Sequence, residues 1–461
     1  MKHDSYKNAT TVSDVAKFGV FTDDKGRTKI NYDRLVKGYL EERSIAYQPE
    51  SKGYYMYDKC GVWRETDVDE IIRDMISILD DIVPDSVSSN LLKEIERILP
   101  LRCISTKKLK DASEYINVKN GLLSLKMFKL RKHKKKFFTT RQLPFNYNPK
   151  AKARRWKRFL KTVFLKDKQL RHLLQEITGY VLSSKTDAQC FFFLYSGGAS
   201  GKSVYCKIVT MLVGGEKYVS NVTLSDLNKS FARRQMYEAM ANIAAENEPK
   251  IFNTETIKAI TSGDSIQMEG KYEKPFSAVI TAKLIFSLNN LPKPKDTTYA
   301  FYRRLVIVPF LARFLENPNP DMKDEFKRNP DILKELEPEL SGVLAWAVKG
   351  LKRLIKNGYK FTHSDKADEL LNEYRRDIDP VLDFFKEAIK ADVNSKLSYD
   401  RLYGAFEKWR KDNGVKTTKE RREFIKDLRY HLEQENIASK KKHSNEIYFL
   451  TGIAFKKSFD K

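Results

Sequence analysis

Apolar positions follow two different spacings along the chain, and each spacing predicts one kind of element. Short continuous apolar runs are typical of strands buried in a parallel sheet. They lie at 192–195, 240–245, 284–288 and 305–310. Apolar residues three or four positions apart indicate helices with one buried face. They occupy 68–82, 170–182 and 344–354. This mixture of strands and helices predicts an α/β fold.

The N-terminal part, residues 1–147, is expected to form its own α/β domain. The aromatic stretch 54–57, the turn 58–61 and the apolar pair 62–63 predict a hairpin. Lysines and arginines crowd 126–136 beside strand-like apolar residues. This basic stretch leaves two alternatives open, a hairpin that contacts DNA or an ordinary solvated face.

The middle of the chain predicts a helical segment and a nucleotide domain. Residues 148–185 have helical spacing and are expected to form a collar in front of a domain at 186–350. Residues 351–377 are expected to act as a linker.

The C-terminal part, residues 378–461, has the pattern of a winged helix, three helices followed by a hairpin. The expected helix starts are Asp379 with Pro380, Ser398, and the capping-box spacing at 417–420. The expected strands are 437–439 and 447–450.

Basic residues gather on the third of these helices and in the turn after it. They are Arg422, Lys426, Arg429, Lys440, Lys441 and Lys442. A basic helix suits the major groove of duplex DNA, and a basic turn suits phosphates. The alternative is a winged helix that docks on a protein and has a solvated basic face.

The net charge of the chain indicates which class of molecule it binds. The 461 residues include 86 lysines and arginines against 61 aspartates and glutamates, which leaves a net charge of +25. Such a field attracts nucleic acid. Four scattered cysteines predict neither a zinc site nor a disulfide framework. No apolar run approaches the ~20 residues that span a bilayer, so we expect a cytoplasmic protein without a membrane partner.

A glycine-rich turn after the first apolar run carries the most specific chemistry. The segment ends in Gly201, Lys202 and Ser203, preceded by Gly197, Gly198, Ala199 and Ser200. Backbone N–H groups in such a loop cradle phosphates, the lysine reaches the terminal phosphates and the serine binds Mg²⁺. ATP and Mg²⁺ are therefore the expected cofactors. Ser196 replaces the usual first glycine and is expected to carry a strained positive φ. The alternative is a turn with a chance Gly-Lys-Ser.

Three further groups follow in the order that hydrolysis needs. Glu246 and Glu248 end an apolar strand and could hold the metal, with Glu246 preferred. Asn289 ends the next strand and could orient water, and Arg303 and Arg304 precede the last one.

The order of these motifs resembles the superfamily 3 AAA+ helicases. The segments that carry the resemblance are the phosphate loop, "SGDSIQMEGKYEKPF", "FSLNNLP" and "YRRLVIVPF", over about 150–310. "VKNGLLSL" (118–125) and "LQEITGYVL" (174–182) are similar to segments before the helicase domain in the branch of phages, plasmids, satellite islands and poxviruses. Within it, the chain resembles replication initiators of bacterial mobile elements, of the staphylococcal pathogenicity-island type.

The resemblance implies a role for each matching residue. It implies phosphate binding by Lys202, the metal-proximal acid at Glu246, the γ-phosphate sensor at Asn289 and a finger contributed to the neighbouring subunit by Arg304. It also implies a hairpin in the pore of a ring, with Lys271 on the DNA backbone and Lys274 nearby. Tyr272 departs from the histidine of viral relatives.

These expectations favour an ATP-driven homo-hexameric DNA helicase in the cytoplasm of a bacterial host. Single-stranded DNA would pass through the pore, and duplex origin DNA would bind the winged helix. Two alternatives stay open: an ATP-dependent transcription or packaging factor that does not unwind DNA, and a small-molecule P-loop kinase.

Overall fold

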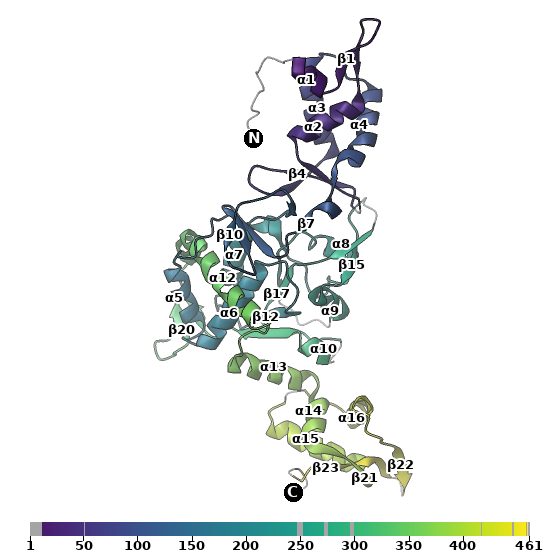
Figure 1. The fold of residues 1–461 in the computed structure, drawn as a ribbon. Helices are drawn as coiled ribbons and strands as arrows, with labels where there is room; N and C mark the ends of the chain where they lie inside the picture. Colours follow the sequence, from purple (N-terminus) through teal and green to yellow (C-terminus); the bar gives the residue numbers. More distant parts are fainter. Residues whose placement is uncertain are drawn as a thin grey trace.

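The computed structural model describes residues 12–49, 51–246, 252–271, 275–295, 299–415, 417–444, 447–457 and 459. These residues form an elongated mixed α/β molecule, with an N-terminal part at one end, a central sheet and a C-terminal part at the other end (Figure 1). Among the helices that the structure describes, none has the length and apolar character needed to cross a bilayer.

The N-terminal part packs helices around a small mixed sheet. Its elements are α1 (Val12–Lys17), β1 (Val20–Thr22), β2 (Thr28–Ile30), α2 (Tyr32–Glu42), β3 (Ile45–Gln48), β4 (Gly53–Tyr57), β5 (Trp63–Thr66), α3 (Val68–Ile82), α4 (Ser89–Arg102) and β6 (Ile104–Ser105). The predicted hairpin is confirmed, because β4 and β5 pair antiparallel. The predicted helix at 68–82 is confirmed as α3, which begins after the N-cap Asp67.

Short strands join this part to the central body. They are β7 (Lys110–Asp111), β8 (Tyr115–Val118), β9 (Gly121–Ser124), β10 (Leu130–Arg131) and β11 (Phe137–Phe138). The basic stretch 126–136 lies in and after the hairpin of β9 and β10, and its lysines are exposed.

A five-stranded parallel sheet forms the centre of the molecule. Its order is β13 (Val219–Ser220), β14 (Ala241–Glu246), β17 (Lys283–Leu288), β12 (Phe191–Tyr195) and β18 (Leu305–Pro309). Residues 191–194 of β12 have no exposed surface, because layers cover both faces. Helix α7 (Lys202–Val213) follows β12, and the antiparallel pair β15 (Ser265–Met268) and β16 (Phe276–Val279) precedes β17.

The remaining elements surround this sheet. They are η2 (Glu216–Tyr218), α8 (Ser230–Arg234), α9 (Glu255–Ser262), α10 (Tyr299–Tyr302), β19 (Arg313–Leu315), β20 (Glu325–Lys327), α11 (Ile332–Leu336) and η3 (Glu337–Glu339).

The expected collar packs into the same core as the sheet. Helices α5 (Arg154–Val163) and α6 (Lys168–Val181) share one apolar cluster with α7 and with α12 (Leu340–Lys356). Helices α6 and α12 come very close together, since a Cβ on Gly350 would lie 2.3 Å from the carbonyl oxygen of Gln175. The segment expected as a linker is largely helical, through the end of α12 and α13 (Asp365–Ile378).

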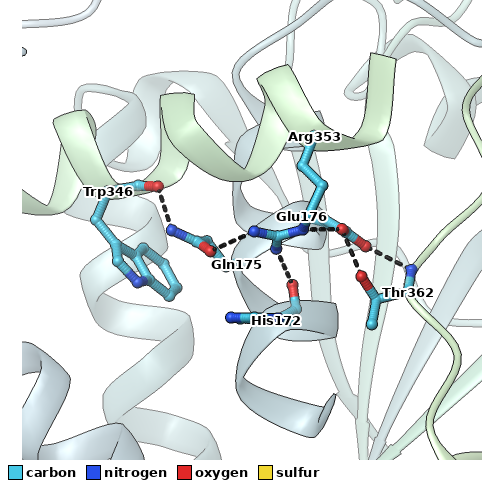
Figure 2. Close-up of polar contacts among 6 residues, drawn as sticks. All are labelled: His172, Gln175, Glu176, Trp346, Arg353 and Thr362. Atoms are coloured by element: carbon cyan, nitrogen blue, oxygen red, sulfur yellow. Dashed lines mark hydrogen bonds and ion pairs between the residues drawn. The ribbon is translucent and has the colours of Figure 1, made fainter. Parts of the chain in front are cut away.

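A buried ion pair joins α6 to α12 (Figure 2). The carboxylate of Glu176 is fully buried and lies 2.5 Å from Nε of Arg353. It also accepts hydrogen bonds of 2.6 Å from the backbone N–H and the hydroxyl of Thr362. Arg353 donates further bonds to the carbonyl oxygen of His172 and the side chain of Gln175. Removing Arg353 would leave the Glu176 carboxylate buried without its counter-charge, a change that typically costs about 3–5 kcal/mol.

The C-terminal part contains three helices and a three-stranded sheet. Its elements are α14 (Pro380–Ala388), β21 (Ile389–Ser398), α15 (Tyr399–Asp412), α16 (Arg421–Gln434), β22 (Lys441–Ser444) and β23 (Ile447–Phe455). Two predicted helix starts are confirmed, because Asp379 and Ser398 accept capping bonds from Leu382 and Arg401.

Three details of this part differ from the sequence prediction. The capping box at 417–420 is wrong, because the Thr417 hydroxyl donates to the carbonyl oxygen of Asp377 and helix α16 begins after Glu420. The strand predicted at 437–439 is also wrong, because Ile437 closes the end of α16 through a bond to Leu432, and the basic run itself forms β22. Strand β21 was not expected, since most of its residues are polar.

Candidate functional site

The loop between β12 and α7 exposes its backbone toward a cavity. Positive φ angles fall on Gly198 (118°), Ala199 (48°) and Gly201 (89°). The strain expected at Ser196 is therefore wrong, because Ser196 is not among the residues with positive φ. Glycine suits position 201, because its φ of 89° strains other residues and a Cβ there would lie as close as 3.0 Å to the ring of Phe159.

Ser196 instead orders the loop with its hydroxyl. This oxygen lies 2.6 Å from the hydroxyl of Ser200 and accepts a bond from the N–H of Gly198. It also accepts a 2.5 Å bond from Nζ of Lys202. A serine at the first position of the motif is thus compatible with a folded phosphate loop.

Lys202 connects the loop to the tip of the neighbouring strand. Its Nζ donates to the carbonyl oxygen of Ser196 at 2.9 Å and to Oδ1 of Asn289 at 3.0 Å. All three acceptors of the ammonium group are neutral oxygens. The two residues expected to face the γ-phosphate are therefore in direct contact, and the positive charge has no carboxylate in these bonds to neutralise it.

A cavity of about 580 Å³ opens beside this loop. Its lining includes residues of the phosphate loop, Ser203 and Asn289, and also Phe159 and Phe314, whose rings stack at 6.1 Å. Basic residues Lys327 and Arg328 lie at the same cavity. These four residues could not be recognised from the sequence, because they belong to segments without a recognisable motif.

Burial lowers the pKa of Lys202 to about 8. Only the protonated amine attracts a triphosphate, so the affinity of the free protein for ATP should fall as the pH rises through 8. The expected loss between pH 7 and pH 9 is about tenfold. Titration of a fluorescent ATP analogue over this range measures it.

The control for this pH prediction is Lys202→Arg, whose guanidinium stays charged over the whole range. Its affinity is expected to be weaker but constant between pH 7 and pH 9. A wild-type affinity that does not change over this interval contradicts the assignment.

The backbone of the preferred acidic residue, Glu246, lies at the same edge of the sheet. Glu246 ends β14 and pairs in register with Leu288, directly before Asn289. This register places the backbone of Glu246 at the edge of the sheet that carries the phosphate loop, with β17 between β14 and β12. Ser203 is exposed in the first turn of α7. The side chain of Glu246 and all of Glu248 lie outside the described residues.

The two arginines lie at the opposite edge of the sheet. Leu305 pairs with Phe191 at the start of β12, whereas the phosphate loop follows the end of that strand, about 16 Å away along five residues. Arg304 is 8% exposed and donates to the Ala300 carbonyl oxygen and the Ser262 hydroxyl. The guanidinium of Arg304 is thus held by its own subunit in this structure, and its role as a finger toward a neighbour stays a prediction. Arg303 is exposed.

The predicted hairpin is present as the antiparallel pair β15 and β16, and its place in a pore stays a prediction. Helix α8 supports it, because Arg233 donates to the carbonyl oxygen of Gln267 and Ser230 donates to the carboxylate of Glu269. Lys271 is exposed between the two strands. Lys274 and Tyr272 lie outside the described residues.

The basic residues expected to bind duplex DNA are all on the surface. Arg422, Lys426 and Arg429 are exposed along α16. Lys440, Lys441 and Lys442 are exposed at the start of the hairpin, where Nζ of Lys441 lies 4.4 Å from the ring centre of Tyr448.

Comparisons with known proteins match three separate segments. Residues 33–165 match the family described as D5 N terminal like, residues 194–304 a family of unknown function, and residues 376–456 the family described as Poxvirus D5 protein-like. These matches agree with the order of the N-terminal, central and C-terminal parts.

Several viral proteins are similar to this chain. "Putative helicase L207/L206" of Acanthamoeba polyphaga mimivirus is 25% identical over 54% of this chain and 27% of its own length. "Putative helicase 022R" of Frog virus 3 is 26% identical over 55% and 28%. "Putative helicase 184R" of Invertebrate iridescent virus 6 is 21% identical over 82% and 43%. The chain spans less than half the length of these relatives.

Among solved structures, the apo C-terminal region of NrS-1 (305–718) is similar with a TM-score of 0.48 and 11% identity, over 90% of this chain and 97% of that chain. The family matches and the viral relatives support a relationship to the poxvirus-like primase-helicase family.

Proposed function

We propose that this relative of viral helicases and primases is an ATP-dependent DNA helicase of the superfamily 3 AAA+ type. It would act as a homo-hexamer in the replication of a mobile genetic element. The observation that carries this proposal is the contact between Lys202 and Asn289 at the mouth of the loop cavity. This contact brings together a cation that would bind phosphate, Lys202, and a polar side chain that would sense the γ-phosphate, Asn289.

The residues at this cavity fit a magnesium-bound nucleoside triphosphate. The backbone of 197–201 and Nζ of Lys202 would hold the phosphates, and Ser203 with Glu246 and Glu248 would hold the metal. The ring of Phe159 or Phe314 offers an apolar surface for the base. ATP supplies the free energy of hydrolysis. Asn289 would orient the attacking water.

The position of Arg303 supports an oligomer. Its backbone lies at the edge of the sheet opposite the phosphate loop, so it does not complete the site of its own subunit. In a ring, that edge can face the phosphate loop of a neighbour, where an arginine stabilises the charge of the transition state. Hydrolysis would then require adjacent subunits.

The surface charges support DNA as the substrate. Lys271 on the β15–β16 hairpin would contact the backbone of a single strand without reading its sequence. The exposed basic residues of α16 and β22 would bind duplex DNA, with the C-terminal part as a winged helix.

Lys271→Ala tests translocation separately from hydrolysis. We expect this variant to retain most basal ATPase activity and to lose at least about 90% of strand displacement, since each hairpin loses its phosphate contact. A forked duplex with one labelled strand measures unwinding.

Lys349→Ala, on the exposed side of α12, is the matched control and is expected to unwind like wild type. If Lys271→Ala also unwinds like wild type, the pore assignment is wrong. If wild type hydrolyses ATP on DNA but displaces no strand, a DNA-dependent ATPase that does not unwind replaces the helicase proposal.

A further inference from the structure

Helix α13 lies between the central sheet and the C-terminal part (Figure 1). It packs along β18 on one side and continues into α14 on the other. Two adjacent residues of this helix carry its contacts: Tyr374 touches the central part, and Arg375 touches both the central part and the C-terminal part. Neither residue belongs to a motif of the nucleotide site.

Tyr374 contacts the segment that carries Asn289. Its hydroxyl donates a 2.5 Å hydrogen bond to the carbonyl oxygen of Pro292, three residues after Asn289. Its ring is 4% exposed and lies edge-on to Phe193, within the strand that leads to the phosphate loop, at 6.4 Å. This one side chain therefore fixes both the sensor segment and the strand beside it.

Arg375 contacts the residue next to the exposed arginine and also the C-terminal part. Its guanidinium lies 5.6 Å from the ring centre of Tyr302, which directly precedes Arg303. On its other side, Nε lies 3.8 Å from Oδ1 of Asp383 in α14. Arg376 approaches the second oxygen of this carboxylate at 3.9 Å. A charged contact thus links α13 to the first helix of the C-terminal part.

We propose that α13 couples the nucleotide site to the C-terminal part, with Tyr374 as a positioning residue for the Asn289–Pro292 segment. This inference rests on the proposed function. When the segment moves with the state of the nucleotide, the bond to Pro292 moves Tyr374, and the contacts of Arg375 and Arg376 carry the change to Asp383. Because such coupling is reciprocal, nucleotide would change the affinity for DNA, and DNA at the C-terminal part would change the affinity for nucleotide, by the same factor.

Tyr374→Phe tests the positioning role, because it removes only the hydroxyl and keeps the buried ring. We expect kcat for ATP to fall about tenfold while KM stays within about twofold, since a displaced sensor affects the reacting geometry more than phosphate binding. Tyr403→Phe is the matched control, because it also removes a hydroxyl that donates to a backbone carbonyl, that of Lys419. Both variants should have similar melting temperatures, which excludes general destabilisation as the cause.

Asp383→Asn tests the second half of the link. We expect its basal ATPase to match wild type, while the change in affinity for a fluorescent ATP analogue on adding duplex DNA disappears. For wild type this change is expected to be about fivefold or more. Asp412→Asn, an exposed aspartate in α15, should keep it.

The outcomes separate this inference from the proposed function. An active wild type with normal kcat in Tyr374→Phe overturns the positioning role. An Asp383→Asn variant that keeps the full response to DNA overturns the transmission to the C-terminal part. A wild type that neither binds nor hydrolyses ATP overturns the proposed function, and the inference with it.

Discussion

Replacing Lys202 with alanine should reduce ATP hydrolysis by about 10²- to 10³-fold or more and abolish unwinding, because the only cation bonded to the Ser196 and Asn289 oxygens in the described site is lost. The fold should survive, since the lysine is buried at a cost to its charged state, as its lowered pKa shows. Steady-state release of phosphate and thermal unfolding measure the two expectations.

Lys207→Ala is the matched control, because Lys207 lies on the exposed side of the same helix, α7. Its ATPase activity and melting temperature should match wild type. An active Lys202→Ala variant would mean that the loop does not bind the phosphates of ATP.

Replacing Arg303 with alanine should lower the rate of hydrolysis by about 10³- to 10⁵-fold without destabilising the fold, because its side chain is exposed. Arg304→Ala should instead lower the melting temperature, since the Ala300 carbonyl and the Ser262 hydroxyl lose their buried donor. Comparing activity with thermal unfolding distinguishes a residue that acts in catalysis from one that supports the structure.

A mixing experiment tests action between subunits. Arg303→Ala and Lys202→Ala proteins, each inactive alone, should regain partial activity when mixed. In mixed rings some interfaces combine an intact Arg303 with an intact Lys202. If activity never returns in mixtures that form rings, Arg303 does not act on a neighbouring site.

Local patterns explain which features could be predicted from the sequence. The strand, loop and helix around Lys202 lie within one short segment, so apolar spacing and glycines suffice to place them. The same holds for α3 with its N-cap Asp67 and for the β15–β16 hairpin. The contact between Lys202 and Asn289 follows from strand order, because the carboxyl ends of neighbouring parallel strands meet at one edge.

Features that depend on distant segments could not be predicted. Arg303 and Arg304 are adjacent identical residues, and only the packing of α9 and α10 decides which one is buried. Phe159 and Phe314 meet at the cavity although no motif marks either of them. Strand β21 is mostly polar and has an irregular register between Ala391 and Lys396, so its pattern resembles a loop.

The ion pair of Glu176 and Arg353 can form only after the long segment between the two residues has been synthesised. Arg353 follows Glu176 by 177 residues, which a ribosome adds in roughly 9–35 s at about 5–20 residues per second. Throughout that time the nascent α6 has its acidic side chain and its apolar stripe without the helix that covers them. The growing chain must therefore hold an incomplete core in water until α12 emerges.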